Sequence, residues 1–195
     1  RVELATSADF TAVDRASTSA KGATSQAFAS LTPNTTYYAR ATALAFNGAE
    51  QASAASAGKA TLAVTPTGAA VGGETATAIT ASWSTTNSVD TFYRVELSTS
   101  ADFTAVDRAS TSAKGATSQV LASLASNTTY YARVTALAFN GANQASAVGA
   151  GKATLAAAPT GAALGAETAA AVTASWSTAN GSETLYRVEL ATSAD

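Results

Sequence analysis

Residues 130–137 read YYARVTAL, and in this stretch residues suited to a core alternate with residues suited to an outer face. The residues expected to face a core are Tyr130, Ala132, Val134 and Ala136, and those expected to face outward are Tyr131, Arg133 and Thr135. A period of two is typical of a β-strand that has one buried and one solvated face. We therefore predict a strand here, in a sheet that covers a core.

Similar alternation occurs in 78–84 (AITASWS) and 93–98 (YRVELS), where Arg94 and Glu96 are expected to face outward. Turn signals separate such runs, and the Asn-Gly pairs at 47–48 and 140–141 favour type I′ hairpins. Many inward positions hold alanine, so the core must depend on a few large side chains, namely Trp83, Tyr93, Leu97, Phe103, Leu121, Tyr130 and Phe139. Short strands divided by turns predict an all-β sandwich.

The sequence repeats itself. Residues 1–26 recur at 94–119 with Ser98 in place of Ala5 as the single change, and a third copy opens at Arg187 and runs to Asp195. The starts at Arg1 and Arg94 are 93 residues apart, which is the size of one small β-domain and far more than a solenoid repeat of about 20 to 50 residues. The chain is therefore expected to be a tandem array of domains.

Several motifs of this repeat resemble those of fibronectin type III domains. They are a Trp followed by a Tyr-Arg-Val-Glu segment (Trp176 and 186–189), and then 31–37, LTPNTTY. In that family the Trp lies on strand B, the Tyr-x-Val segment lies on strand C, and the last tyrosine forms a tyrosine corner. The resemblance implies tandem Greek-key β-sandwiches, with Tyr37 and Tyr130 as the corner tyrosines.

Aligned on this resemblance, the chain divides into three units. We expect a partial domain with strands C to G in residues 1–61 (the first unit), a complete domain in 62–155 (the central unit), and a partial domain with strands A to C in 156–195 (the last unit). Two explanations of the partial units stay open. The chain is either a window on a longer array, or partial units of neighbouring chains complete each other by exchanging strands.

Composition and charge exclude several classes of function. The sequence contains no His and no Cys, which excludes a Ser-His-Asp or Cys-His nucleophile and the common zinc sites. A net charge of −2 argues against a nucleic-acid-binding surface, and no apolar run approaches the roughly 20 residues of a membrane span. The acidic residues form no recognisable catalytic or metal-binding motif, so we expect no enzyme activity, no metal and no cofactor.

Two sets of surface residues are candidate sites. The alternation places two tyrosine–arginine pairs on the outer face of the sheet, namely Tyr38 with Arg40 and their equivalents Tyr131 with Arg133. These residues could form an interaction face, or a cation–π pair that covers the sheet. The second set comprises Asn34, Asn127 and Asn180, which stand in N-glycosylation triplets.

The expected function is structural. Near-identical units, short joins and few charged residues (12%) favour a repeat module of an extended extracellular filament, stalk or surface layer, in which the partners are copies of the chain itself. One alternative is an adhesin whose repeats bind a glycan or a cell-surface protein. A weaker alternative is a spacer module in a secreted polysaccharide-degrading enzyme.

Overall fold

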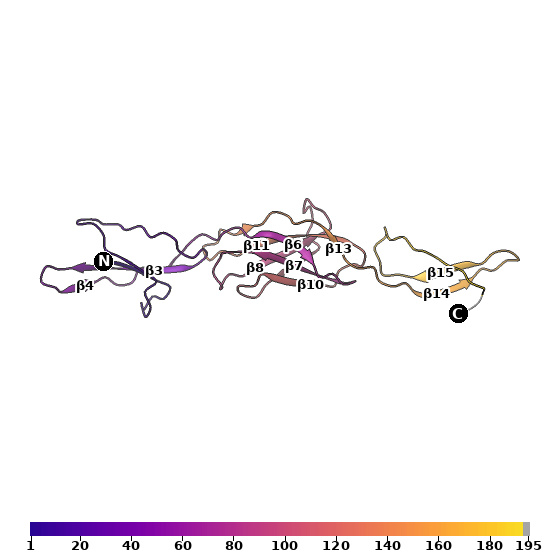
Figure 1. Ribbon diagram of the computed structural model, residues 1–195, viewed down its shortest axis with the longest axis horizontal. Coiled ribbons are helices and arrows are strands. Elements are labelled where there is room, and N and C mark those ends of the chain that lie inside the picture. Colours follow the sequence, from indigo (N-terminus) through magenta and orange to yellow (C-terminus); the bar gives the residue numbers. More distant parts are fainter. Residues whose placement is uncertain (193–195) are drawn as a thin grey trace.

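The computed structural model describes residues 1–192, so the last three residues of the last unit lie outside the described part. Residues 1–192 form fifteen strands and no helix, and every pair of neighbouring strands is antiparallel. The three units follow one another along the long axis of the molecule (Figure 1).

The central unit contains two sheets. One has the order β10-β7-β6, formed by Ser118–Ala122, Ala78–Ser84 and Thr67–Gly72. The other has the order β9-β8-β11, formed by Arg108–Thr111, Tyr93–Ser98 and Thr129–Ala136, and the short strands β12 (Gln144–Ala145) and β13 (Lys152–Ala153) pair with opposite ends of β11. In letters these sheets are A-B-E and C′-C-F-G, which fits the Greek-key sandwich that the resemblance implies. The central unit therefore has a fibronectin type III-like sandwich fold.

The core lies between these two sheets and confirms the alternation. Its fully buried side chains come from both sheets and are Ile79, Ala81, Tyr93, Val95, Leu97, Ala132, Val134 and Ala136. Trp83 from β7 packs against Tyr93 from β8, with ring centroids 5.2 Å apart. The hydroxyl of Tyr130 accepts a hydrogen bond from the backbone N–H of Ala125 (3.1 Å), which forms the expected tyrosine corner.

Glu96 faces outward as expected, but it is buried, because arginine and phenylalanine side chains cover it. Three other expectations about the central unit are wrong. Phe139 is not a core residue, because its side chain lies on a loop and is 47% exposed. Phe103 is not a core residue either, because its ring lies on Arg133, on the outer face of the sheet. The Asn-Gly turns are not type I′. Only the glycines have positive φ, and Gly141 N–H donates to Ala138 O, as in a longer hairpin loop that ends in a left-handed glycine.

Each end unit contains only one of the two sheets. The first unit has the C′-C-F-G sheet, made of β2 (Arg15–Ser17), β1 (Val2–Ala5), β3 (Thr36–Leu44), β4 (Glu50–Ala52) and β5 (Lys59–Ala60). The last unit has only β14 (Thr160–Gly165) and β15 (Thr173–Ser177), the equivalents of strands A and B.

The end units lack two strands that the sequence predicts. Residues 188–191 have the same sequence as β1, VELA, but form no strand, and residues 25–29, the equivalent of β10, form none either. Strand C pairs with strand F and strand E pairs with strand B, and each partner is missing from the end unit concerned. A short strand is stable only on a neighbouring strand, so identical residues adopt different conformations.

Candidate functional site: the joints between units

The tyrosine–arginine face predicted from the sequence makes its contacts within the unit. The guanidinium of Arg133 donates to the Glu96 carboxylate at 3.1 and 2.8 Å, and lies 4.6 Å from the ring centroid of Phe103. In the first unit Arg40 contacts Glu3 and Phe10 in the same way. The aromatic partner of each arginine is therefore a loop phenylalanine and not the neighbouring tyrosine.

The phenylalanines of this cluster have an unusual backbone. Phe10 and Phe103 have φ angles of 53° and 50°, a left-handed conformation that bulky residues rarely adopt. Their N–H groups donate to Ser7 O and Ser100 O, so each phenylalanine ends a tight turn and its ring lies over the arginine. This turn was not recognisable from the sequence, because no glycine or asparagine marks the left-handed position.

Hydrogen bonding changes the acidity of the enclosed carboxylate in the first unit. The hydrogen bond from Arg40 holds the pKa of Glu3 below its ordinary value of 4.5, and ion pairing with Arg1 acts in the same direction, against the opposing effect of burial. The charge of Glu3 is thus compensated within the sheet.

The tyrosines of the face pack over glycines. A Cβ atom at Gly151 would lie 2.6 Å from Cε1 of Tyr131, and one at Gly58 would lie 3.0 Å from Cε1 of Tyr38. Both rings are only partly exposed. The four residues of the predicted interaction face are therefore partly exposed and make packing contacts within their own units. Residues 1–192 contain no group of three or more His, Cys, Asp or Glu that could hold a metal ion.

Asn34 connects the first unit to the central unit. Its side chain is fully buried, and its Nδ2 donates to Thr91 Oγ1 (2.9 Å) and to Leu137 O (3.1 Å). Its Oδ1 accepts from the backbone N–H of Phe139 (2.8 Å). The φ angle of Asn34 is 51°, and asparagine tolerates this left-handed conformation better than most residues. One amide group thereby makes three hydrogen bonds to two segments of the next unit, the one before β8 and the one after β11.

A second asparagine holds the connecting segment of the chain. Asn87 of the central unit accepts from the N–H of Val64 (2.7 Å) and donates to the carbonyl of the same residue (2.8 Å). Ser88 N–H donates to Pro33 O (3.0 Å), and the adjoining Pro66 is fully buried. Hydrogen bonds to Val64 and Pro33 and the burial of Pro66 therefore hold the segment that connects the two units.

Equivalents of several of these contacts recur 93 residues later, between the central and last units. Asn127 donates to Thr184 Oγ1 (2.8 Å), Asn180 accepts from and donates to the backbone of Ala157 (2.7 and 2.9 Å), and Gly181 N–H donates to Ser126 O (3.0 Å). The last of these uses backbone atoms only, which is why Ser126 can replace the proline at position 33. We call these two sets of contacts the first joint and the second joint.

The joints assign a different role to the residues predicted as glycosylation sites. At Asn34 both protons of Nδ2 are donated and the side chain is fully buried, so the joint as formed leaves no room for an attached sugar. Asn127 is exposed but stands at the equivalent place, and Asn180 holds the connecting segment. Sequence reasoning identified these three residues and missed what they bind.

No protein-family model and no curated protein sequence matches the chain. Among solved structures, the chain is similar to the FN1-FN3 domains of chicken CNTN1, with 22% identity and a TM-score of 0.44 over 65% of this chain and 44% of that one. It is also similar to an FN3 domain of human collagen XX (20% identity, TM-score 0.36, 49% of this chain and 100% of that one). A third similar structure is domains d3-d4 of the rat CD45 extracellular region, with 14% identity and a TM-score of 0.41 over 72% of this chain and 75% of that one.

In the part of the chain that the structure describes, no helix is long and apolar enough to cross a membrane.

Proposed function

We propose that the chain is a structural repeat module, without catalytic activity, of an extended extracellular filament, stalk or surface layer. The observation that carries this proposal is the first joint, in which a fully buried Asn34 makes three hydrogen bonds to two segments of the next unit. Flexible linkers contain exposed polar residues that are free of such contacts, and the chain has no linker of that kind at this position.

Burial makes these hydrogen bonds selective for one arrangement of the units. A buried polar group that loses its partner costs about 1–3 kcal/mol. If the two units tilted, Asn34, Thr91 and the backbone groups at 137 and 139 would lose partners together. The cost of bending is thus concentrated in one place, and the joint favours a single angle between units. At the second joint the bonds of Asn127 to Thr184 and of Asn180 to Ala157 stand at equivalent positions, which supports a similar arrangement of successive units.

A distance measurement across the first joint tests the proposal. The sequence contains no cysteine, so the paired substitutions Gln51→Cys and Thr111→Cys place one fluorophore in each of the two units at exposed positions. Single-molecule energy transfer should give a narrow distribution of efficiencies. With Asn34→Ala in addition, the distribution should broaden, because the three bonds are lost.

Asn47→Ala is the matched control. Asn47 belongs to the same unit, and its side chain accepts a hydrogen bond from Ala49 within its own turn. This variant should keep the narrow distribution. A distribution in the parent chain as broad as that of Asn34→Ala would contradict the proposal, because the joint would then not fix the angle.

A further inference from the structure

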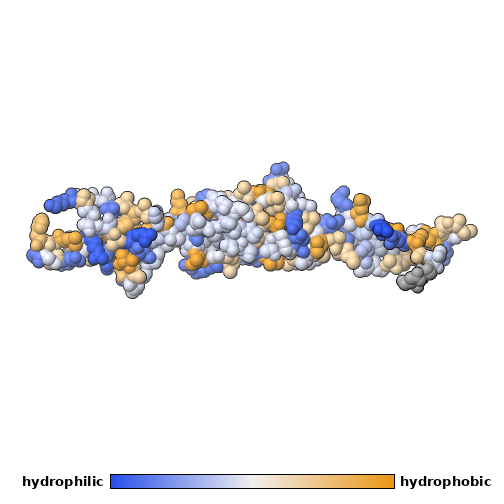
Figure 2. All heavy atoms as spheres, viewed as in Figure 1, coloured by the Kyte–Doolittle hydropathy of each residue, from blue (hydrophilic) through white to orange (hydrophobic). Residues whose placement is uncertain are grey.

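Two asparagine–glycine pairs lie in equivalent loops of the first and central units. Asn47 and Gly48 are in the loop between β3 and β4, and Asn140 and Gly141 are in the loop between β11 and β12. All four residues are exposed, and Asn140 is exposed although the first joint is formed beside it. In the face drawn in Figure 2 the units meet end to end, so water reaches the sides of each unit.

An asparagine that precedes a glycine can react with its own main chain. The glycine nitrogen loses its proton to hydroxide or water and attacks Cγ of the asparagine, and the Cγ–Nδ2 bond breaks as ammonia leaves with a proton from the solvent. The product is a cyclic succinimide, which water opens. Opening at Cγ gives aspartate, and opening at the backbone carbonyl gives isoaspartate, whose main chain runs through Cβ and Cγ. Glycine favours the attack because it has no Cβ to obstruct it.

The loop geometry favours this ring closure at Asn140. Its Oδ1 accepts a hydrogen bond from the backbone N–H of Ala142 (3.0 Å), which folds the side-chain carbonyl over the peptide of Gly141. A donor at this oxygen stabilises the negative charge that the oxygen acquires during the attack, as in an oxyanion hole. Within residues 1–192 this is the one hydrogen bond of the Asn140 side chain, so the departing Nδ2 group is not held. The Gly141 N–H donates to Ala138 O (2.9 Å), a single bond in an exposed loop that must open first.

The same arrangement recurs at Asn47. Its Oδ1 accepts from the N–H of Ala49 (3.1 Å), and Gly48 N–H donates to Ala45 O (3.0 Å). Gly48 and Gly141 both have a φ angle of 82°. The reactive geometry is therefore a property of the repeat and not of one loop.

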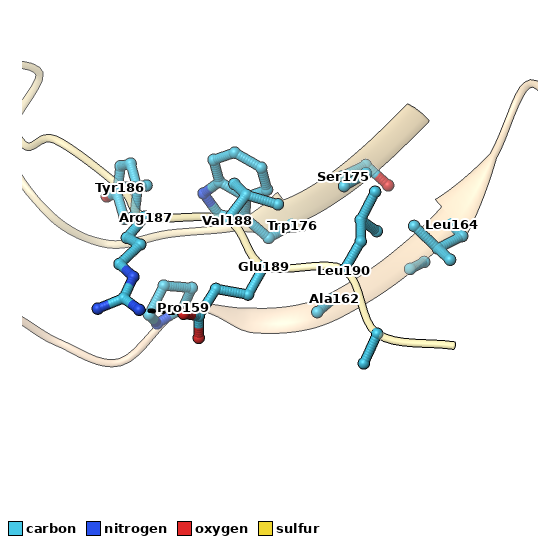
Figure 3. A pocket seen from close by; sticks show the side chains of 13 residues that line it. Pro159, Ala162, Leu164, Ser175, Trp176, Tyr186, Arg187, Val188, Glu189 and Leu190 are labelled. Atoms are coloured by element: carbon cyan, nitrogen blue, oxygen red, sulfur yellow. Dashed lines mark hydrogen bonds and ion pairs between the residues drawn. The ribbon is translucent and has the colours of Figure 1, made fainter. Parts of the chain in front are cut away.

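The third asparagine–glycine pair, Asn180 with Gly181, is held in the second joint. The Nδ2 group of Asn180 donates to Ala157 O (2.9 Å) and to the hydroxyl of Tyr186 (3.1 Å). The ring of Tyr186 packs against the tryptophan of the last unit, in a half-core that is open to solvent (Figure 3). Gly181 N–H donates to Ser126 O (3.0 Å). Both the leaving group and the attacking nitrogen must therefore be released from their partners before this pair can react.

Asn140 directly follows a residue of the first joint. Phe139 N–H donates to Asn34 Oδ1 (2.8 Å), and the loop is closed by a hydrogen bond from Ala138 N–H to Asn143 Oδ1 (2.9 Å). Isoaspartate at position 140 adds an atom to the main chain of this loop, and both products place a negative charge where the amide was neutral. A longer and charged loop moves the Phe139 N–H away from Asn34.

We propose that Asn140 and Asn47 are sites of spontaneous deamidation, and that conversion of Asn140 loosens the first joint. Water is the co-reactant, and ammonia is the product that leaves. The effect on the joint rests on the proposed function, whereas the modification itself does not. A stiff joint thereby softens with age, because the release of ammonia is irreversible.

Peptide mapping of the aged chain tests the modification. Trypsin cleaves after arginine and lysine, and it releases the three pairs in separate peptides, 41–59, 134–152 and 153–187. The folded chain is kept at mildly alkaline pH in water enriched in the heavy oxygen isotope, which labels each converted residue. Asn47 and Asn140 should convert first. Asn180 should convert at least about ten times more slowly, because its reaction must first break several hydrogen bonds of the joint.

The same chain in concentrated urea is the control. Without the fold the three pairs differ little in local sequence, and they should convert at similar rates. Equal rates at Asn140 and Asn180 in the folded chain would overturn the proposal. An Asn140 that converts in urea and stays intact in the folded chain would overturn it too.

Single-molecule energy transfer across the first joint tests the consequence. Asn47→Gln is included, because glutamine cyclises far more slowly and the reaction is then confined to Asn140. The distribution should be narrow in the fresh chain and broad in the aged chain. A chain that also carries Asn140→Gln is the matched control and should stay narrow. Storage at mildly acidic pH, where the glycine nitrogen keeps its proton, is a second control. Hydrogen exchange at Phe139 N–H should become faster once Asn140 has converted, since this group donates to Asn34.

The outcomes separate the two proposals. A chain that has converted at Asn140 and keeps its narrow distribution and slow exchange would overturn the effect on the joint. A distribution that is already broad in the fresh chain would contradict the proposed function, and with it the loosening of the joint. The peptide map depends on mass alone, so it decides in either case whether Asn140 is the reactive site.

Discussion

At the scale of single residues, Trp83 is the largest side chain of a core that is otherwise rich in alanine. Its side chain is 5% exposed and contacts Tyr93, and its Nε1 is buried without a hydrogen-bond partner among the described residues. Trp83→Ala should destabilise the central unit by about 3–5 kcal/mol, because it leaves a large cavity. Urea denaturation followed by circular dichroism measures the loss.

Trp83→Phe is the control for that substitution. It keeps a large aromatic ring and removes the unpaired N–H, whose burial costs free energy in the parent. The loss of stability should therefore be clearly smaller than for Trp83→Ala. Equal losses for both variants would contradict the assignment of Trp83 to packing.

Glu3 predicts a dependence of stability on pH. Its pKa in the folded chain lies below 4.5, so its contribution to stability is present above the unfolded pKa and is lost as the pH falls through the lower, folded pKa. The first unit should therefore lose stability as the pH falls below about 4.5, and Glu3→Gln should flatten this dependence. Amide hydrogen exchange in β1 and β3 from pH 6 to pH 3, corrected for intrinsic exchange, measures it.

At the scale of elements, one glycine allows the edges of the two sheets to approach. A Cβ atom at Gly149 would lie 2.2 Å from Ala69 O in β6, and Gly149 N–H donates to Ala132 O in β11. Gly149→Ala should destabilise the central unit, because backbone must move to admit the methyl group. Gly72→Ala, at the end of β6, has open space around it and serves as the control. Similar denaturation midpoints for the two variants would contradict this close approach.

The elements also show what the sequence could predict. Period-two alternation located β7, β8 and β11 and their buried faces, because each depends mainly on its own residues facing a core. It failed for residues 188–191, which have the sequence of β1 and lack the partner strand that β1 has. It also missed the Phe103 turn, since no glycine or asparagine marks its left-handed position.

At the scale of the whole molecule, the joints could be anticipated only in part. The repeat length indicated the number and order of the units. Asn34, Asn127 and Asn180 were recognisable because each stands in an N-glycosylation triplet. That Asn34 reaches residues 57, 103 and 105 positions away depends on how two folded units meet, and no local pattern contains that information.

Unequal completeness of the units predicts unequal stability. The chain has two tryptophans, one in the central unit and one in the last. In Trp176→Phe the fluorescence reports on Trp83, and in Trp83→Phe it reports on Trp176. At low protein concentration the Trp176 signal should change at lower urea, because its half-core is open to solvent. Coincident transitions would contradict independent units.

The joints also determine how the molecule responds to force. Pulling on the two ends loads the central unit between β6, where the chain enters, and β13, where it leaves, with the Asn34 contacts in series. One unfolded period of 93 residues releases about 310–330 Å of extended chain. Because the periods are nearly identical, complete units in an array would yield at similar loads, one after another. We therefore expect the proposed filament to be stiff at low tension and to lengthen stepwise at high tension.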